Sequence, residues 1–357
     1  MASHRGGSAP PAPRGPRVSG IELAAGSARA VVARIEAGHL RVLARGEAGL
    51  APDAIVGGLV VDRPGVSASL AAALGVAERG VPTERTVVAI DGDDVRTYHL
   101  TTPFEREEST TPIVRAEVDQ ALREARNEAA RRAQAEVEDD PALRGVATAR
   151  LSDDVAGVVL DGRPLESLVG YHGRSLEVHT DVSVAPLVLS GAALATVASP
   201  RRRATAVPGI YAIARLVAES GIADAGIVRL GADTTALALV RERRVVGTRV
   251  FGLGRDAFAL REQTRDADAR IWAECVALPL APRDGPLPER WLFLGVPETL
   301  TALPNALAVI LEEARGGAAR IGPLSPAILS RVFSDVAVHG DDLVAVGAAA
   351  IAAELYG

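Results

Sequence analysis

The period of the hydrophobic positions changes repeatedly along the chain, between the two-residue alternation of strands and the three-to-four-residue spacing of helices. Strand-like segments are residues 18–35 (two strands around a turn at 24–27), 39–47, 56–62, 87–91 and 95–100 (a pair turning at Gly92), 176–184, 227–250 (a hairpin) and 290–294. Helix-like segments are residues 65–79, a segment starting near Pro112, 207–220, 303–314 and 343–355. Because strands and helices interleave, the pattern predicts the α/β class.

The helix near Pro112 has the clearest start signal. Thr111 can cap it and Pro112 suits its first turn. Its apolar positions recur at helical spacing and predict one buried stripe: Val114, Val118, Leu122, Ala125 and Ala129. Glu and Arg fill the other face, which predicts a solvated surface.

The composition excludes several kinds of chemistry. All 39 basic residues are arginines, since the sequence contains no lysine. This excludes a Walker A loop, a kinase-type strand lysine and Schiff-base catalysis. A net charge of −6 offers no basic surface of the kind that nucleic acid requires.

Other features of the sequence indicate a cytoplasmic protein. Cys275 is the single cysteine, so an internal disulfide is excluded and a reducing compartment fits best. No run of 18 or more apolar residues occurs, and the N-terminus lacks an apolar signal region, so we expect a chain that neither spans a membrane nor is secreted. Residues 1–17, rich in Pro, Gly, Ser and Arg, predict a disordered tail.

The segment IVRLGADTTALALV (227–240) has the pattern of a phosphate-binding hairpin. An apolar strand enters a tight turn at Gly231, and Thr234 and Thr235 precede a second apolar strand. Turns of this kind can present backbone N–H groups to phosphate oxygens. Yet Arg229 stands where such a loop usually carries a metal-binding carboxylate.

Four segments, taken in order, resemble the phosphate-1, phosphate-2, adenosine and second connecting motifs of actin-like ATPases. They read GIELAAGSARAVVARI (20–35), AGIVRLGADTTALAL (225–239), WLFLGVPETL (291–300) and LVAVGAAAIA (343–352). The resemblance implies an actin-like (ribonuclease H-like) two-lobed fold with an ATP site between the lobes.

Within that superfamily the chain is most similar to the FtsA family of bacterial cell-division proteins. GGLVVDRPGVSASLAAALGVAERG (57–80) is similar to the FtsA segment after the third strand. ERTVVAIDGDDVRTYHL (84–100) resembles the start of the inserted SHS2/1C domain, and VVLDGRPLESLVGYHGRSLEV (158–178) resembles its end.

The FtsA resemblance implies boundaries for each part of the fold. They are 1–17 for the tail, 18–83 for the first part of lobe 1 (1A), 84–168 for the inserted SHS2/1C-like domain, 169–225 for the second part of lobe 1, 226–340 for lobe 2 (2A with a shortened 2B) and 341–357 for the closing helix of lobe 1. We therefore expect residues 57–80 and 174–184 to belong to one lobe.

The resemblance also places a degenerate nucleotide site on particular residues. The matching positions are Glu22, Ala24, Ala25, Gly26, Arg229, Gly231, Asp233, Thr234, Thr235, Gly295 and Gly347. Where the family's phosphate-1 motif reads Asp-x-Gly-Thr, this chain has Glu22, Ala24 and Ala25, and Val296 replaces a second adenosine-motif glycine. ATP is the implied cofactor, but Arg229 in place of Asp argues against Mg²⁺ and against hydrolysis. The resemblance implies neither a catalytic residue nor a metal site.

Three functions follow as expectations. The first is an FtsA-like division scaffold that binds FtsZ-like or other divisome proteins and self-associates, at the division site or the cytoplasmic face of the membrane. Membrane contact would be peripheral, because nothing after residue 355 resembles the amphipathic helix of FtsA. The alternative is a PilM-like protein of type IV pilus assembly. The second alternative is a working actin-like ATPase or sugar-kinase relative. A kinase needs a catalytic Asp near the phosphate-2 motif, and Asp233 is the only candidate there.

Glu22 and Arg229 depart from the family's two aspartates in complementary ways. In actin-like folds the two phosphate hairpins face each other, so these side chains should lie opposite one another. We hypothesise an ion pair that closes the cleft without nucleotide. The alternative is that both side chains point into solvent.

Overall fold

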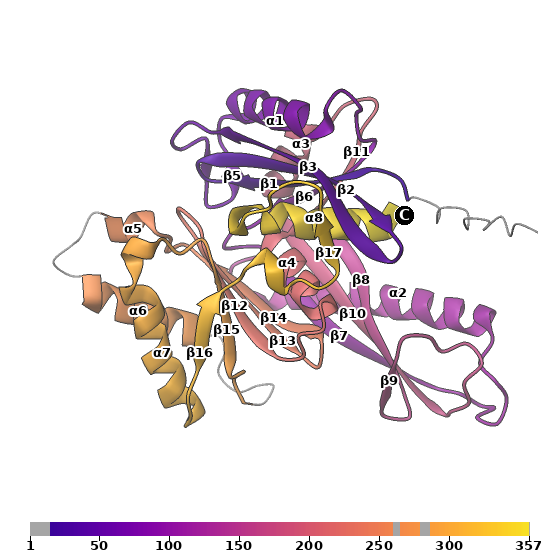
Figure 1. The fold of residues 1–357 in the computed structure, drawn as a ribbon. Helices are drawn as coiled ribbons and strands as arrows, with labels where there is room; N and C mark the ends of the chain where they lie inside the picture. The colour runs from indigo at the N-terminus through magenta and orange to yellow at the C-terminus, as the bar shows by residue number, and fades with distance from the viewer. Residues whose placement is uncertain (1–14, 260–264, 279–285, 357) are drawn as a thin grey trace, which may run out of the picture.

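The computed structural model describes residues 15–259, 265–278 and 286–356. They form two lobes with a small inserted domain (Figure 1). Lobe 1 contains a six-stranded sheet that mixes parallel and antiparallel pairs. In spatial order its strands are β11 (Arg203–Pro208), β6 (Arg85–Ile90), β1 (Val18–Ala24), β2 (Ser27–Glu36), β3 (His39–Gly49) and β17 (Val332–Ser334).

Helices cover both faces of the lobe 1 sheet. α1 (Arg63–Glu78) and α3 (Leu187–Val197) pack on one face, with the short hairpin of β4 (Ile55–Val56) and β5 (Leu59–Val60) beside them. α4 (Gly209–Glu219) and α8 (Leu343–Tyr356) lie on the other face. Gly20 on β1 allows close approach there, because a Cβ at this position would lie 2.0 Å from the Ala345 carbonyl oxygen of α8.

Lobe 2 contains a five-stranded sheet that shares α4 and α8 with lobe 1. In spatial order its strands are β14 (Arg244–Phe251), β13 (Thr235–Arg241), β12 (Ala225–Leu230), β15 (Arg290–Leu294) and β16 (Arg320–Pro323). One face packs on α4 and α8, while the other packs on α6 (Arg265–Ala277) and α7 (Ala302–Arg315). The molecule is therefore layered helix–sheet–helix–sheet–helix.

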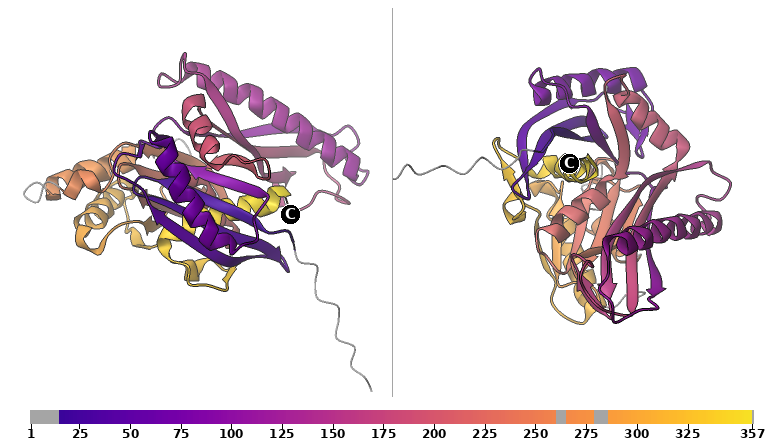
Figure 2. Two further views of the ribbon diagram at one scale, coloured as in Figure 1. Left: turned by 90° about the horizontal axis from the view of Figure 1, so that it is seen from above. Right: turned by 90° about the vertical axis from the view of Figure 1, so that its right-hand side faces the viewer.

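The inserted domain (the insert) is a four-stranded antiparallel sheet with one long helix on one face. Its strands, in spatial order, are β7 (Arg96–Glu105), β10 (Ser175–Pro186), β8 (Thr148–Leu160) and β9 (Arg163–Leu165), and its helix is α2 (Arg115–Asp139). Figure 2 shows the insert beside lobe 2 and projecting from lobe 1.

Two expectations about this region were wrong. Residues 87–91 and 95–100 do not pair, because β6 lies in the lobe 1 sheet, parallel to β1, whereas β7 opens the insert. Residues 174–184 lie in β10 of the insert sheet, not in one lobe with residues 57–80. The insert sheet thus starts at residue 96 and ends at residue 186, rather than spanning 84–168. The cause is that alternation of hydrophobic and polar residues identifies a strand but does not specify which strand it pairs with.

The start of α2 also differs from the prediction. The helix begins at Arg115, after Val114 in extended conformation, and not at Pro112. Ile113 donates its backbone N–H to the Tyr171 carbonyl at 2.8 Å, so this tertiary contact keeps the chain extended. The buried stripe consequently lies further along than predicted: Ala121, Ala125, Ala129, Ala133 and Val137. Two other boundaries differ: residues 203–208 form β11 before α4, and residues 225–251 form three strands rather than a hairpin.

Across the described ranges, no helix combines the length and apolar character needed to cross a bilayer.

Candidate functional site

Two hairpin turns face each other at the cleft between the lobes. In the first, Ala24 pairs with Ser27 and leaves a turn at Ala25 and Gly26, where Gly26 has a φ of 88° that favours glycine. In the second, Leu230 pairs with Thr235 and leaves residues 231–234 as the turn. These are the two turns that the sequence predicted, and residues of both line one small cavity.

Arg229 lies between two carboxylates from lobe 1. Its Nη1 donates to Asp91 Oδ2 at 2.8 Å, and its Nη2 contacts Glu22 Oε1. Glu22 extends from β1 and Asp91 follows β6, while Arg229 extends from β12 of lobe 2. The hypothesised ion pair between Glu22 and Arg229 is therefore confirmed, and it crosses the cleft.

The charges around Arg229 are nearly balanced, and the side chains that carry them are almost fully buried. The side chains of Glu22, Asp91 and Arg229 are 2%, 6% and 12% exposed. Arg29 adds a second guanidinium, with Nη1 3.4 Å from Glu22 Oε2. Two arginines thus face two carboxylates, which compensates for the cost of removing each charge from water.

Burial and pairing oppose each other in setting the pKa values of these groups. Burial raises the pKa of the Glu22 and Asp91 carboxyls above their ordinary values, while Arg229 acts to lower both. Burial acts to lower the pKa of Arg229, but Glu22 and then Asp91 raise it above its ordinary value. Asp91 also accepts from the Ile210 backbone N–H at 3.1 Å, at the first turn of α4.

The polar side chains in and directly after the second turn already form hydrogen bonds within the chain. The Thr235 hydroxyl donates to the Leu253 carbonyl at 2.6 Å and accepts from Trp272 Nε1 at 2.9 Å. Asp233 Oδ2 accepts from the Gly57 backbone N–H of lobe 1 at 2.7 Å. Both side chains are therefore already held by hydrogen bonds within the chain.

Backbone contacts cover the same turn. The segment after β14 reaches back over it, since the Arg255 N–H donates to the Gly231 carbonyl and the Asp256 N–H to the Ala232 carbonyl, both at 2.9 Å. Within the turn, the Gly231 N–H donates to the Thr234 carbonyl at 2.8 Å.

The structure separates the two predicted glycines. Gly295, with a φ of 72°, lines the cavity, and a Cβ there would lie 2.5 Å from the Leu230 carbonyl oxygen. Gly347 does not line the cavity; it allows α8 to approach α4, because its Cβ would lie 2.7 Å from the Ala212 carbonyl oxygen. Gly347 thus has a packing role in this structure, and its assignment to a nucleotide site stays a prediction.

The cleft does not fit the ATP and Mg²⁺ that the motifs imply. Its cavity measures about 40 Å³, which is room for about three waters at 10–15 Å³ each. Ligand pockets usually measure about 300–1,000 Å³. Arg229 moreover places a cation where a metal-binding carboxylate would be needed.

Sequence reasoning missed Asp91, although the chain carries a signal for it. Asp91 follows VVAI, an apolar run that is buried on both sides and therefore typical of a central strand. Because β6 runs parallel to β1, the ends of these strands meet at the same edge of the sheet. A carboxylate directly after such a strand is therefore placed at the cleft.

These two lobes, with their facing hairpins, define a protein of the actin-like fold. No protein-family model matches the chain, and no curated protein does.

Solved structures show the same fold. The chain is similar to a chain of the PilM–PilN type IV pilus biogenesis complex, with a TM-score of 0.57 and 17% identity over 94% of this chain and 98% of that one. It is also similar to the ethanolamine utilization protein EutJ from Carboxydothermus hydrogenoformans (TM-score 0.46, 14% identity, 96% and 92% covered). A third similarity is to the ROK hexokinase from Thermus thermophilus (TM-score 0.38, 15% identity, 95% and 98% covered).

Proposed function

We propose that the protein is an actin-like scaffold whose cleft is closed by its own Arg229 instead of by Mg²⁺ and nucleotide. The observation that carries the proposal is the contact of one buried guanidinium with Glu22 and Asp91. In an actin-like ATPase, hydrated Mg²⁺ and the phosphates join the two lobes. Here an arginine of lobe 2 joins the same two lobes through carboxylates of lobe 1.

A closed cleft of this kind suits a protein that acts by binding partners. Its lobes have their relative position without a ligand, so a surface spanning both lobes is preorganised for a partner. We propose a PilM-like role in a membrane-associated assembly in preference to the FtsA-like division role. The similarity to a chain of the PilM–PilN complex over 94% of this chain and 98% of that one, with a TM-score of 0.57, supports this choice.

The first test measures nucleotide binding and turnover. We expect no heat of binding when Mg-ATP or Mg-ADP is titrated into the purified protein. We also expect no Mg²⁺-dependent ATP hydrolysis above background. Turnover of about 1 s⁻¹ or more, within the ordinary range of enzymes, would refute the proposed closure by Arg229. The Arg229→Asp variant restores the family's residue, and binding gained by it would identify the arginine as the cause.

The second test separates the two scaffold roles. Deletion of the gene in the source organism should abolish a membrane-associated assembly, such as surface pili, and leave division normal. Filamentous cells with intact pili would instead support the division role. Complementation with wild-type protein and with the Arg229→Asp variant would show whether the closed cleft is required in the cell.

A further inference from the structure

We propose that Asp91 couples the closure of the cleft to the position of the insert. The inference deepens the proposed function, because it rests on the ion pairs of Arg229 holding the lobes together. Asp91 begins the segment 91–95, called here the junction loop, which connects β6 of lobe 1 to β7 of the insert. The same residue therefore belongs to the cleft and to the entrance of the insert.

The side chain of Asp91 joins three parts of the molecule. Its Oδ2 accepts from Arg229 of lobe 2 at 2.8 Å. Its Oδ1 accepts from the Ile210 N–H at the start of α4 at 3.1 Å. Loss of the arginine would leave a buried carboxylate with only its backbone donors, and such a charge is strongly unfavourable. We then expect the junction loop to move toward solvent, because this would hydrate the unpaired carboxylate of Asp91.

The backbone of the junction loop is packed as tightly as its side chains. A Cβ on Gly58 would lie 1.8 Å from the Asp91 carbonyl oxygen, and a Cβ on Gly92 would lie 2.8 Å from the Gly57 carbonyl oxygen. Glycine is therefore needed on both sides of this contact. Because Gly57 also donates to Asp233 of lobe 2 at 2.7 Å, the loop, lobe 1 and lobe 2 meet at one point.

A second carboxylate of the loop reaches lobe 2 directly. Asp93 lies against Gly252, which directly follows β14, because a Cβ on Gly252 would lie 2.9 Å from Asp93 Oδ2. Burial raises the pKa of Asp93, with further contributions from Asp94 and Asp233. Lobe 2 thus approaches the junction loop at two residues, with an ion pair at Asp91 and a close contact at Asp93.

The insert contacts both lobes, and Asp181 of β10 has polar partners in lobe 1 and within the insert. The Tyr211 hydroxyl of α4 donates to Asp181 Oδ2 of β10 at 2.9 Å, and His99 Nδ1 lies 2.8 Å from Asp181 Oδ1. On the other side, β14 of lobe 2 lies against β7 and β8. Domains within one chain commonly move relative to one another unless their interface is large and apolar.

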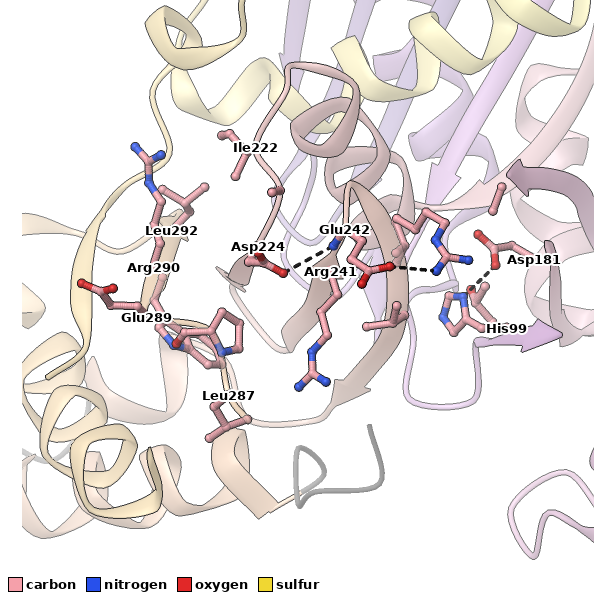
Figure 3. Close-up of a pocket in the computed structure, with 18 of the residues that line it drawn as sticks. His99, Asp181, Ile222, Asp224, Arg241, Glu242, Leu287, Glu289, Arg290 and Leu292 are labelled. Carbon is pink, nitrogen blue, oxygen red and sulfur yellow. Dashed lines mark hydrogen bonds and ion pairs between the residues drawn. The ribbon is translucent and has the colours of Figure 1, made fainter. Parts of the chain in front are cut away.

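A large groove lies between the insert and lobe 2 and leaves space for such motion. It measures about 1660 Å³. Figure 3 shows His99 and Asp181 on the insert side and Asp224, Arg241 and Glu242 on the lobe 2 side. Rotation of lobe 2 away from lobe 1 would break the Arg229–Asp91 contact and shift β14 along β7. Because the junction loop contacts both the cleft and the insert, we expect the insert to shift relative to lobe 1 when the cleft opens.

The test measures distances between spin labels by pulsed electron paramagnetic resonance. One pair reports the insert against lobe 1, through Ala72→Cys on α1 and Asn127→Cys on α2, both exposed, in a Cys275→Ser background. A second pair reports lobe 2 against lobe 1, through Ala72→Cys and the native Cys275 on α6. Partner and nucleotide are absent throughout, so the result is independent of the assays of the proposed function.

We compare Arg229→Met and Asp91→Asn with wild type. In wild type we expect one distance between the two labels of each pair. Each variant should give two or more distances in both pairs. Asp91→Asn keeps an oxygen for the Ile210 N–H, so it provides a folded variant if Arg229→Met does not fold. The matched control is Arg29→Met, which removes another arginine from Glu22; the ion pairs described for Arg29 go to Glu22, Glu47 and Asp341, not to Asp91.

Two populations in both pairs, with the control unchanged, would support the coupling. A change between the lobes without a change between insert and lobe 1 would overturn it, since the cleft would open independently of the insert. No change in either pair would overturn it as well. An equal effect of Arg29→Met would also overturn it, because the change in distances would then not depend on the Arg229–Asp91 contact.

Discussion

The ion pair between Glu22 and Arg229 permits a quantitative test of what closes the cleft. Arg229→Ala would leave Asp91 without a cation and Glu22 with only Arg29, and the side chains of these carboxylates are only 6% and 2% exposed. Removing one partner of a buried pair costs about 3–5 kcal/mol, because it leaves an uncompensated charge. We expect a loss of that size in the free energy of unfolding.

The corresponding shift in melting temperature can be worked out from the chain length. An entropy of unfolding of about 2.1 cal/mol/K per residue gives roughly 0.75 kcal/mol/K for the 357 residues. A loss of about 3–5 kcal/mol therefore lowers Tm by about 4–7 °C. The assay is urea unfolding followed by circular dichroism, with thermal unfolding as a second measurement. The control is Arg270→Ala, which breaks an exposed i,i+4 pair and should cost under about 1 kcal/mol.

A double-mutant cycle decides whether the two groups act on each other. Glu22→Ala and Arg229→Ala together should cost less than the sum of the single losses, because the second change removes the charge that the first one isolated. Additive losses, or a single loss no larger than that of the Arg270 control, would refute the reasoning.

Three further predictions concern other parts of the molecule. Burial and Arg244 hold the pKa of His179 below its ordinary value of 6.5. The free energy of unfolding should therefore decrease as the pH falls from 6.5 toward the pKa of His179 in the folded protein, because the unfolded chain binds the proton more readily. His179→Gln should remove this pH dependence, measured by urea unfolding at several pH values. Gly20→Ala should lower the free energy of unfolding by about 1–3 kcal/mol, the usual cost of overpacking. Gly191→Ala, where the new methyl group faces open space on α3, should raise it by about 0.5–1 kcal/mol in the same assay. Trp272→Phe removes a buried donor to a hydroxyl and should cost about 1 kcal/mol by urea unfolding.

Several local elements of the fold could be predicted from the sequence, although β8 and α3 were missed. Both phosphate-type hairpins occur where small residues interrupt apolar strands, at Ala25–Gly26 and at residues 231–234. β15 occupies the predicted residues 290–294, and α8 nearly the predicted range. These elements are local consequences of side-chain period and turn chemistry, so neighbouring residues are enough to define them.

Strand partners could not be predicted in the same way. β6 and β7 are separated by only five residues, which is compatible with a hairpin, yet they lie in different sheets. Pairing depends on which apolar faces are buried together, and that is decided by segments far away in the chain, such as β1 and β11. The boundaries of the insert were misplaced for this reason.

The sequence by itself determined the α/β class, the two turns and the replacement of a carboxylate by Arg229. It also indicated that Glu22 and Arg229 are complementary in charge. Only the tertiary structure decided that Asp91 joins them and that Thr235 and Asp233 are already hydrogen-bonded within the chain. The physical reason is range: the period of a strand is fixed over a few residues, whereas the environment of a buried charge is set by every element packed around it.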